Sequence, residues 1–341
     1  MGLFLRFSAI GGTIALPLLG AGTVTPKPGL SPYLGLIGVG VAVHVFGYVL
    51  NDVVDLPIDR HEPRRVDFPL VRGTISPGAA LAVAVLQIPI ALLLTHRNGG
   101  NVPAYGALVT SIACLTIYDM WGKKVAFPPL TDLVQGLGWA ALGAYGAYIA
   151  ADCFSTSTTV LFIYIVTMIV MANGVHGSVR DLENDLRCGV RSTAIMLGAR
   201  PGPGQTILIS PAMERYAQLL NGLLVAVALG SLITNRFRYD RSALMWTTAV
   251  VGTLAFFSLL LLRKIGRRDQ NRQKLNTIGM LHLMLLFLMM IFLFVAGMGP
   301  ALSALILLIF FAPLLTHSWL YGAILSGLRK FSVFPSREKS A

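Results

Sequence analysis

The stretch Asn51-Asp-Val-Val-Asp-Leu-Pro-Ile-Asp-Arg-His-Glu-Pro-Arg-Arg65 follows directly on an apolar run, Tyr33 to Leu50. It places four carboxylates and three arginines within fifteen residues. Ionisable groups at membrane depth are costly, and they usually face the interior of a helical bundle or a water-filled cavity. The stretch therefore predicts a membrane helix that ends in a polar site.

The composition indicates an all-α, polytopic integral membrane protein. Of the 341 residues, 55% are hydrophobic and 12% are charged, and the mean hydropathy is +0.71. A soluble domain carries about twice that charged fraction. Apolar runs near the ~20 residues that cross a bilayer core recur along the chain instead. We predict ten membrane helices, at 3–22, 33–50, 78–96, 102–118, 132–150, 157–176, 215–234, 243–262, 276–297 and 301–326.

The basic residues predict the orientation of the bundle. With the N-terminus inside, 22 of the 27 Lys and Arg residues fall in the inner segments, and such a bias sets the topology of membrane proteins. We expect both termini and the long inner loops, 51–77 and 177–214, to lie on the cytoplasmic side of the membrane. Because the loops are compact, we expect this membrane to be a bacterial plasma membrane. These loops account for the net charge of +12 and attract anionic membrane lipid. Nucleic acid is an unnecessary partner.

Most of the few acidic residues lie in two short stretches. Eight of the 15 are Asp52, Asp55, Asp59, Glu62, Asp67, Asp181, Glu183 and Asp185. Spacings of three, four and seven residues project side chains from one face of a helix, although Pro57 can turn the chain within the first set. Carboxylates this close repel one another and raise each other's pKa unless a cation sits among them.

The chemistry of these clusters favours magnesium and a diphosphate. Oxygen-only clusters suit Mg²⁺, which binds one or two carboxylates together with a substrate phosphate. Basic side chains nearby would donate charge-assisted hydrogen bonds to the phosphate oxygens. The local candidates are Arg64, Arg72, Lys123, Lys124 and Arg191. Either acidic stretch alone could be a solvated helix end, but two stretches at matching helix ends on one side indicate a site.

Both stretches resemble motifs of the UbiA superfamily of intramembrane prenyltransferases. The first motif, NDxxDxxxD, matches Asn51-Asp-Val-Val-Asp-Leu-Pro-Ile-Asp59 in full. The second, DxxxD followed by a G-(I/V)-(K/R)-S-T-A run, matches Asp181-Leu-Glu-Asn-Asp-Leu-Arg-Cys-Gly-Val-Arg-Ser-Thr-Ala194. Each follows the expected helix, the second and the sixth. The resemblance extends over about residues 1–297, which implies a nine-helix prenyltransferase domain, with an additional membrane helix and a basic inner tail in 298–341.

The resemblance implies a function and a set of site residues. A prenyl group would pass from a prenyl diphosphate to a lipophilic or aromatic acceptor through an allylic carbocation, with release of pyrophosphate. Mg²⁺ is the implied cofactor. The implied metal ligands are Asp52, Asp55, Asp59, Asp181 and Asp185. The implied diphosphate-binding residues are Asn51, Arg64, Arg72, Lys123, Lys124 and Arg191.

Two departures from the family pattern concern substrate contacts. Many members carry an Arg-Pro-Leu-x-x-Gly run after the first motif, but this chain reads Phe68-Pro-Leu-Val-Arg-Gly73, so Arg72 is expected to replace the missing arginine. The first helix carries Arg6 but lacks the second basic residue of quinone-pathway members, where it reads Phe7-Ser-Ala-Ile10. The second departure weakens the case for a carboxylated acceptor such as 4-hydroxybenzoate.

Two alternative functions use the same carboxylates. A terpene cyclase of the same superfamily would ionise the diphosphate without an acceptor, and the sequence separates it poorly from a transferase. A cation-coupled transporter, from another class of protein, would carry its ion on intramembrane carboxylates. The transporter predicts acidic residues in the middle of helices, whereas these cluster at helix ends beside long loops.

Four other polar residues lie near the predicted site. His44 and His176 precede the two motifs by seven and five residues, so either could act as a base, although a lone helical histidine is more often satisfied by packing and hydrogen bonding. Tyr118 and Asn173 lie near inner helix ends and are candidate polar contacts. Helix-end hydrogen bonding would explain them equally well.

Overall fold

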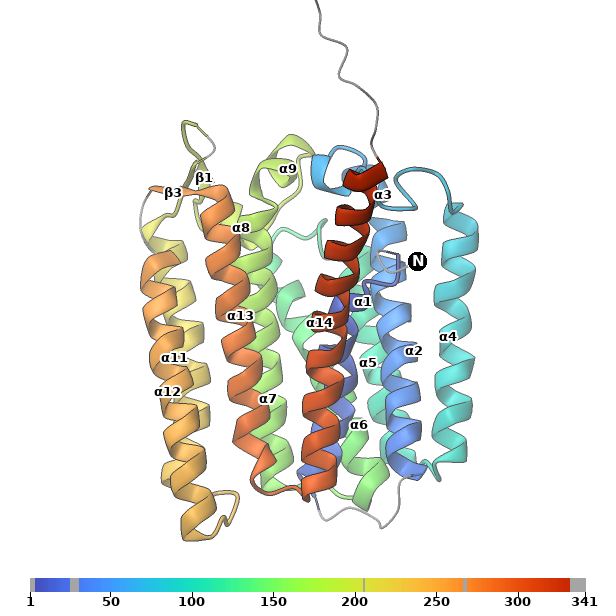
Figure 1. Ribbon diagram of the computed structural model, residues 1–341, viewed down its shortest axis with the longest axis vertical. Coiled ribbons are helices and arrows are strands. Elements are labelled where there is room, and N and C mark those ends of the chain that lie inside the picture. Colours follow the sequence, from blue (N-terminus) through green and yellow to red (C-terminus); the bar gives the residue numbers. More distant parts are fainter. Residues whose placement is uncertain (1–3, 25–30, 205, 266–268, 332–341) are drawn as a thin grey trace, which may run out of the picture.

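The fold is a bundle of long helices with a cap of short elements at one end (Figure 1). The computed structural model describes residues 4–24, 31–204, 206–265 and 269–331. Within them, ten long helices correspond to the ten predicted membrane segments: α1 Phe7–Gly22, α2 Ser31–Val54, α4 Pro77–Arg97, α5 Val102–Trp121, α6 Pro128–Ala151, α7 Thr156–Met171, α11 Pro211–Ile233, α12 Arg241–Ile265, α13 Arg272–Val295 and α14 Pro300–Phe331. The predicted all-α polytopic bundle is confirmed.

The length and composition of these helices are those of a multi-pass membrane protein. Seven helices in the described part are long and apolar enough to cross a membrane. Their starts follow from local sequence: Ser76 and Ser210 each accept a hydrogen bond from a backbone amide of the first turn, and Pro77 and Pro211 follow them directly. Serine at the N-cap and proline at the next position are favoured because neither leaves a backbone N–H without a partner.

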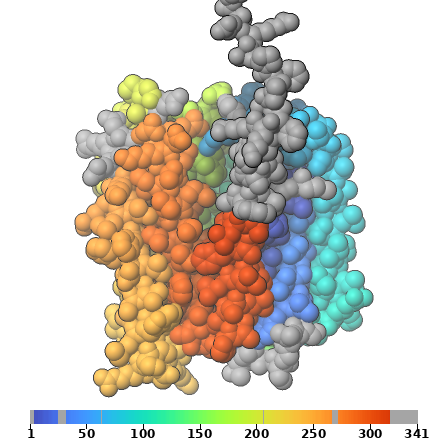
Figure 2. Space-filling view, in the orientation of Figure 1, coloured from blue at the N-terminus to red at the C-terminus, as the bar shows by residue number. Residues whose placement is uncertain are grey.

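The long helices form two groups that meet through α6 and α7. In the first group α2 packs on α1, α4 and α5, and α6 packs on α1 and α5. In the second group α11 packs on α7 and α12, and α12 packs on α13. The additional helix α14 lies along α1, beside α13 on the surface of the bundle (Figure 2). We call these two groups the first and second halves of the bundle.

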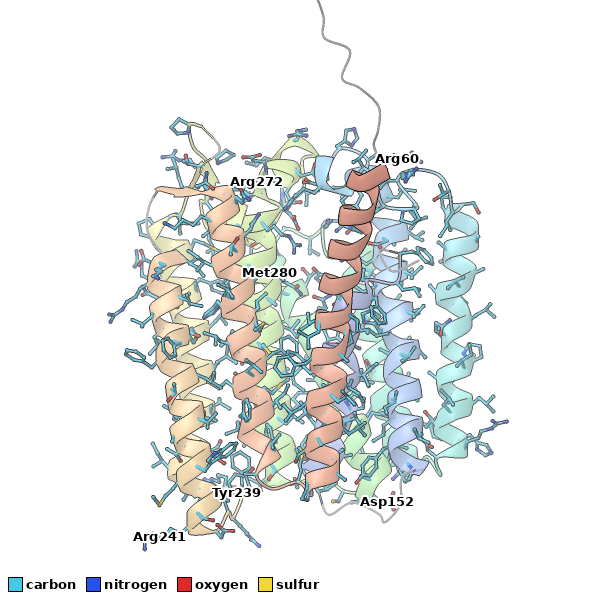
Figure 3. All side chains as sticks on the ribbon, in the orientation of Figure 1. Arg60, Asp152, Tyr239, Arg241, Arg272 and Met280 are labelled. Atoms are coloured by element: carbon cyan, nitrogen blue, oxygen red, sulfur yellow. The ribbon has the colours of Figure 1, made fainter. Side chains whose placement is uncertain are left out.

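The polar elements collect at one end of the bundle, which we call the inner end. The short helices there are α3 Leu56–Asp59, η1 Pro63–Arg65, α8 Ser178–Arg180, α9 Leu182–Arg187 and α10 Thr193–Met196. Arg60 and Arg272 lie at this end, whereas Asp152, Tyr239 and Arg241 lie at the opposite one (Figure 3). Both acidic stretches are therefore carried to the same end, as the sequence predicts.

Two features of the inner half were not predicted from the sequence. A small antiparallel sheet of β1 Arg200–Pro201, β2 Thr206–Leu208 and β3 Asp269–Asn271 joins two inner loops. Strands of two or three residues are too short to show an alternating pattern. The predicted helix 157–176 also stops being α-helical at Met171 and continues as a π-helix, η2 Ala172–Gly177. Short π-helical segments are rare and often mark functional sites.

Close packing between α1 and α6 depends on glycine. A Cβ atom built on Gly20 of α1 would lie 1.8 Å from the carbonyl oxygen of Gly143 in α6. Only a residue without a side chain lets the two backbones approach this closely. Gly20 of α1 thus packs directly against the backbone of α6 at Gly143.

We expect Gly20→Ala to lower the thermal stability of the protein. The added methyl group forces α1 away from α6, and overpacking of this kind costs about 1–3 kcal/mol. Gly222→Ala in α11 is the matched control, because a Cβ there meets nothing within 4 Å. Thermal unfolding in detergent micelles measures both. An unchanged melting temperature for Gly20→Ala would show that α1 and α6 are farther apart.

Candidate functional site

The first acidic motif lies where α2 ends. The α-helix stops at Val54, and Asp55 begins the short helix α3, in which Pro57 is one of the first residues. The chain keeps helical spacing across this break, because the amide of Asp55 bonds to the carbonyl of Asn51 at 2.8 Å and that of Asp59 bonds to Asp55 at 2.9 Å. Pro57 therefore leaves the helical relation between Asp55 and Asp59 intact.

Two arginines neutralise part of the first motif. Asp52 and Asp59 are buried. One guanidinium nitrogen of Arg65 lies 3.1 Å from a carboxylate oxygen of each. Arg6, directly before α1, forms a second ion pair with Asp52. Burial nevertheless raises the pKa of Asp59 to about 6, although the nearby charge of Arg65 opposes the shift.

A lysine occupies the space between the two motifs. Lys123, after the end of α5, places its Nζ atom 2.7 Å from an oxygen of the buried Asp55. Burial by itself lowers the pKa of Lys123, but Asp55, Asp185 and Asp59 raise it above its ordinary value. Burial raises the pKa of Asp185 to about 6, with Lys123 opposing. Asp55, Asp59 and Asp185 thus all act on the charge of Lys123.

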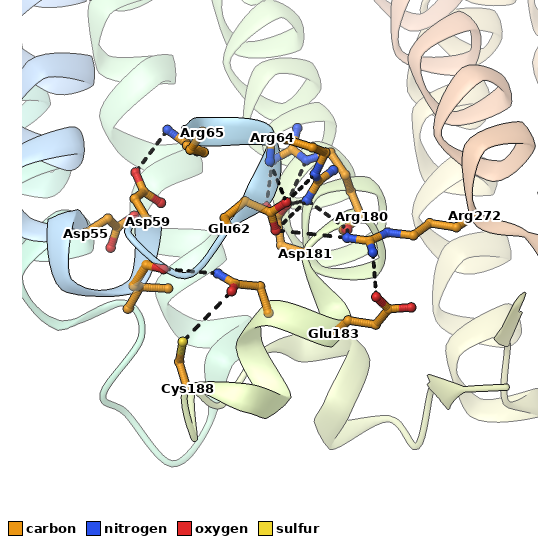
Figure 4. A network of polar contacts seen from close by, with 12 residues as sticks. Asp55, Asp59, Glu62, Arg64, Arg65, Arg180, Asp181, Glu183, Cys188 and Arg272 are labelled. Atoms are coloured by element: carbon orange, nitrogen blue, oxygen red, sulfur yellow. Dashed lines mark hydrogen bonds and ion pairs between the residues drawn. The ribbon is translucent and has the colours of Figure 1, made fainter. Parts of the chain in front are cut away.

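Arg64 joins the two acidic stretches directly (Figure 4). Its guanidinium donates to Glu62 at 2.7 Å and to Asp181 of the second motif at 3.0 Å. Arg180, at the end of α8, also donates to Asp181, at 2.8 Å. Burial opposes ionisation of Asp181, but the hydrogen bond and charge of Arg180, together with Arg64, lower its pKa to about 2. Asp181 is thus a carboxylate with its charge already matched.

Further contacts fix the second motif against the first. Arg272, the first residue of α13, pairs with Glu183 and lies 4.0 Å from Glu62 (Figure 4). Arg187 donates to the backbone carbonyl of His61 at 3.1 Å. The amide of Asp185 bonds to the carbonyl of Asp181 at 2.9 Å, and Asp181 is the N-cap of α9, which carries Asp185. Helix α13 therefore helps to hold the two acidic loops together.

Two buried carboxylates near the motifs were missed by the sequence analysis. Asp119 of α5 accepts a hydrogen bond from Asn51 at 3.3 Å, and its other oxygen has no partner among the described residues. Asp132 of α6 accepts one from Thr193 at 2.6 Å and so anchors the run after the second motif. Each stands alone in an apolar segment and forms no spaced pattern. An acidic residue within a membrane helix is itself a sign of a functional site, and this was the sequence signal that could have identified both residues.

The remaining basic residues predicted to bind diphosphate lie on the surface. Arg72, Lys124 and Arg191 are exposed, and none forms an ion pair with another described residue. Arg65, which the sequence analysis did not select, contacts the first motif instead. Its neighbour Arg64 matched the family position, and sequence spacing alone does not tell which of two adjacent arginines turns inward.

The predicted polar contacts have different surroundings. His44 is fully buried, and its two ring nitrogens lie 2.9 Å from the Thr13 hydroxyl and from the carbonyl of Leu5, which is a packing role. Tyr118 is half-buried near the inner end of α5. Asn173 lies in η2, and its buried side-chain nitrogen has no partner among the described residues.

The donor set of this end of the bundle fits a hard divalent cation. The clustered ligands are carboxylates, which Mg²⁺ prefers, without cysteine or histidine among them. In the described part of the chain no three such groups converge closely enough to form a ready metal cage. Arginine and lysine side chains take up the carboxylate oxygens instead. A metal would therefore exchange with these cations.

A sequence model of the UbiA prenyltransferase family matches residues 9–280. Among curated relatives, a 4-hydroxybenzoate octaprenyltransferase of Pseudoalteromonas translucida is 31% identical over 154 residues, which cover 45% of this chain and 50% of the relative. A digeranylgeranylglyceryl phosphate synthase of Hyperthermus butylicus is 28% identical over 195 residues, covering 54% of this chain and 62% of the relative. The matches thus span less than two thirds of these relatives. The second part of α13 and all of α14 lie beyond the family match.

Solved structures share the fold. A UbiA homologue from Aeropyrum pernix K1 superposes with a TM-score of 0.64 at 18% identity, covering 82% of this chain and 94% of that one. A UbiA homologue from Archaeoglobus fulgidus, solved with GPP and Mg²⁺ bound, gives a TM-score of 0.60 at 15% identity, covering 85% of this chain and 98% of that one. At these identities the likeness concerns the arrangement of the helices.

We expect Arg64→Leu to loosen the contact between the two acidic loops. Arg64 is partly exposed, so its ion pairs contribute modestly, and backbone amides in 56–65 and 181–187 should exchange about two- to fivefold faster. Arg60→Leu is the control, because Arg60 is exposed and forms no ion pair with a described residue. Hydrogen–deuterium exchange with mass spectrometry in detergent measures both. Equal exchange in the two variants would refute the role of Arg64.

Proposed function

The chain belongs to the UbiA prenyltransferase family, and from that membership we propose that it is an Mg²⁺-dependent intramembrane prenyltransferase. Its donor would be a prenyl diphosphate and its acceptor a lipophilic or aromatic molecule, with pyrophosphate as the second product. The observation that carries the proposal is the meeting of the two acidic motifs at the inner end, where Arg64 bridges Glu62 and Asp181. Two acidic motifs from separate halves suit a diphosphate held between them.

In this proposal the carboxylates bind the metal and the basic side chains bind the diphosphate. Metal would be held by Asp52, Asp55, Asp59, Asp181 and Asp185. When bound, Mg²⁺ supplies positive charge against the negative charge that develops on the departing diphosphate. Arg65 and Lys123, which pair with these carboxylates in the structure, would donate hydrogen bonds to the diphosphate oxygens. Asn51 and Arg64, and the exposed Arg72, Lys124 and Arg191, are further candidates for diphosphate contact.

The reaction would proceed by loss of the diphosphate. The bond between the allylic carbon and the diphosphate oxygen breaks, and its electron pair leaves with pyrophosphate. The acceptor then forms a bond to the allylic cation and loses a proton. Tyr48 lies one helical turn deeper in α2 than Asp52, and its ring centroid is 6.1 Å from that of the buried Trp139. Such aromatic faces would favour a nearby cation, and the apolar walls would exclude water.

We place this site on the cytoplasmic face of the membrane. The inner segments carry 22 of the 27 Lys and Arg residues, and positively charged loops remain on that side. The basic loops would also attract anionic lipid, and this attraction would hold the inner end of the bundle against the lipid headgroups. A bacterial plasma membrane is the proposed location.

We expect Mg²⁺-dependent release of pyrophosphate by the purified protein in nanodiscs. Geranyl, farnesyl and geranylgeranyl diphosphate would each be supplied with Mg²⁺ or with EDTA, alone and with an aromatic acceptor. Asp55→Ala and Asp185→Ala should each lower the rate about 100-fold or more, because charge stabilisation in the transition state is lost. Asp67→Ala is the matched control, since Asp67 is exposed and forms no ion pair with a described residue. It should leave the rate unchanged.

The products of the same assay separate the transferase from its alternatives. A prenylated acceptor is the expected product. A cyclic hydrocarbon or terpene alcohol formed without acceptor would identify a terpene cyclase instead. If the protein neither released pyrophosphate nor bound any of the three diphosphates with Mg²⁺, the enzyme proposal would fail and the cation transporter would become the better explanation.

A further inference from the structure

A chain of four hydrogen-bonded side chains crosses the second half of the bundle. His176 Nε2 lies 2.9 Å from His282 Nδ1, and His282 Nε2 lies 3.0 Å from the Ser258 hydroxyl. That hydroxyl donates to Asn221 Oδ1 at 2.7 Å. The four residues come from η2, α13, α12 and α11, and His282, Ser258 and Asn221 are fully buried. The proposed reaction uses none of them.

With the side-chain oxygen of Asn221 toward Ser258, as the structure has it, the chain fixes where the protons lie on both imidazoles. In this orientation Asn221 Nδ2 has no partner among the described residues. The Ser258 proton is directed to Asn221, so the Ser258 oxygen must accept a hydrogen bond from His282 Nε2. A neutral imidazole has one N–H, so His282 Nδ1 carries a lone pair and accepts from His176 Nε2. The one proton of neutral His176 is then committed. Its Nδ1 atom is left with a lone pair and no partner among the described residues.

This Nδ1 atom faces a cleft between η2, α8 and α13. The cleft has a volume of about 40 Å³, or about 430 Å³ when the open space at its mouth is counted, and is lined by His176, Arg180, Asn276 and apolar residues that include Val179, Leu275 and Leu283. A Cβ atom on Gly279 would lie 3.0 Å from Nδ1, so the missing side chain leaves that nitrogen accessible.

The side chains that line the cleft favour the binding of a neutral, apolar molecule over that of an anion. Its one arginine, Arg180, already donates to Asp181 at 2.8 Å. The lone pair of His176 would repel an anion, whereas it can accept a hydrogen bond from a hydroxyl group. Met280, which lines the cleft and is 62% exposed, lies on the outer surface of α13 two turns from its start (Figure 3). A ligand can therefore enter from the lipid.

A purely structural role explains the chain less well. Four helices could be tied together by any closed set of hydrogen bonds, but this set ends on an acceptor that is open to a cleft. The π-helix η2 carries that acceptor, and short π-helical segments frequently occur at functional sites. Asn221, at the other end, sets the direction of the whole chain.

We propose that this cleft binds the acceptor substrate, and that the acceptor is a neutral, largely apolar molecule whose hydroxyl group donates to His176 Nδ1. Only the name "acceptor" rests on the proposed function; the binding site rests on the cleft and the chain. Arg180 connects the two sites, because it lines the cleft and pairs with Asp181 of the second motif. His176 is in this proposal a binding residue. The specificity is for a phenol or an alcohol rather than a carboxylate.

The test measures binding to His176 directly. Protein labelled with ¹⁵N-histidine would be prepared in detergent without added lipid, and the His176 signals would be assigned with a His176→Gln variant. We expect Nδ1 to be unprotonated and its resonance to shift on titration with 1-naphthol. 1-Methoxynaphthalene, which cannot donate a hydrogen bond, and 1-naphthoate, which is an anion, should bind about tenfold more weakly or not at all.

A second variant keeps the histidine and narrows the cleft. Gly279→Ala places a methyl group against Nδ1 and should weaken 1-naphthol binding about tenfold without changing the protonation of His176. Gly252→Ala in α12 is the control, because a Cβ there meets nothing within 4 Å, and it should bind as the natural protein does. Equal affinity of the Gly279 and Gly252 variants would refute the site.

Other outcomes separate this proposal from the proposed function. A protonated Nδ1, or 1-methoxynaphthalene binding as tightly as 1-naphthol, would overturn the cleft proposal while leaving Mg²⁺-dependent pyrophosphate release untouched. Specific binding of 1-naphthol to a protein that releases no pyrophosphate would support the cleft as a ligand site and would remove the transferase as its purpose.

Discussion

The structure depends on the cost of placing carboxylates at the end of membrane helices. Removing a charge from water is unfavourable unless it is paired and hydrogen-bonded. Asp52, Asp55 and Asp59 are buried, and each is matched by an arginine or a lysine. The matching is incomplete, because burial still raises the pKa of Asp59 to about 6. A further positive charge close to Asp59 would therefore stabilise its ionised form.

The need to pair buried carboxylates with cations explains why distant parts of the chain meet at the inner end. Lys123 follows α5, Arg64 lies in η1 and Arg272 begins α13, and each carries its charge to an acidic residue of another element. The ion pairs hold these loops to one another, while α1 and α6 pack closely through Gly20 and Gly143. The apolar bundle thus carries the inner end, where the two acidic stretches meet.

The sequence predicts the parts of this protein that depend on local pattern. Ten apolar runs predict ten helices, and the spacing of Asp52, Asp55 and Asp59 predicts a shared face at the end of one of them. Features that depend on contacts between distant residues escaped prediction. Asp119 stands alone in its helix, and only folding brings it to Asn51. The π-helix η2 and the three-stranded sheet arise from packing and pairing that no short pattern records.

The ion pairs of the first motif also bear on how a diphosphate would be bound. No three metal-ligating groups converge in the described part of the chain, because Arg65 and Lys123 occupy the carboxylate oxygens. A divalent cation brought in with the diphosphate would take over that neutralisation. Arg65 and Lys123 would then be released beside the phosphate oxygens, which offer them hydrogen bonds as strong as those they lose. Arg65 and Lys123 would in this way neutralise the buried carboxylates before the diphosphate binds and donate hydrogen bonds to the diphosphate afterwards.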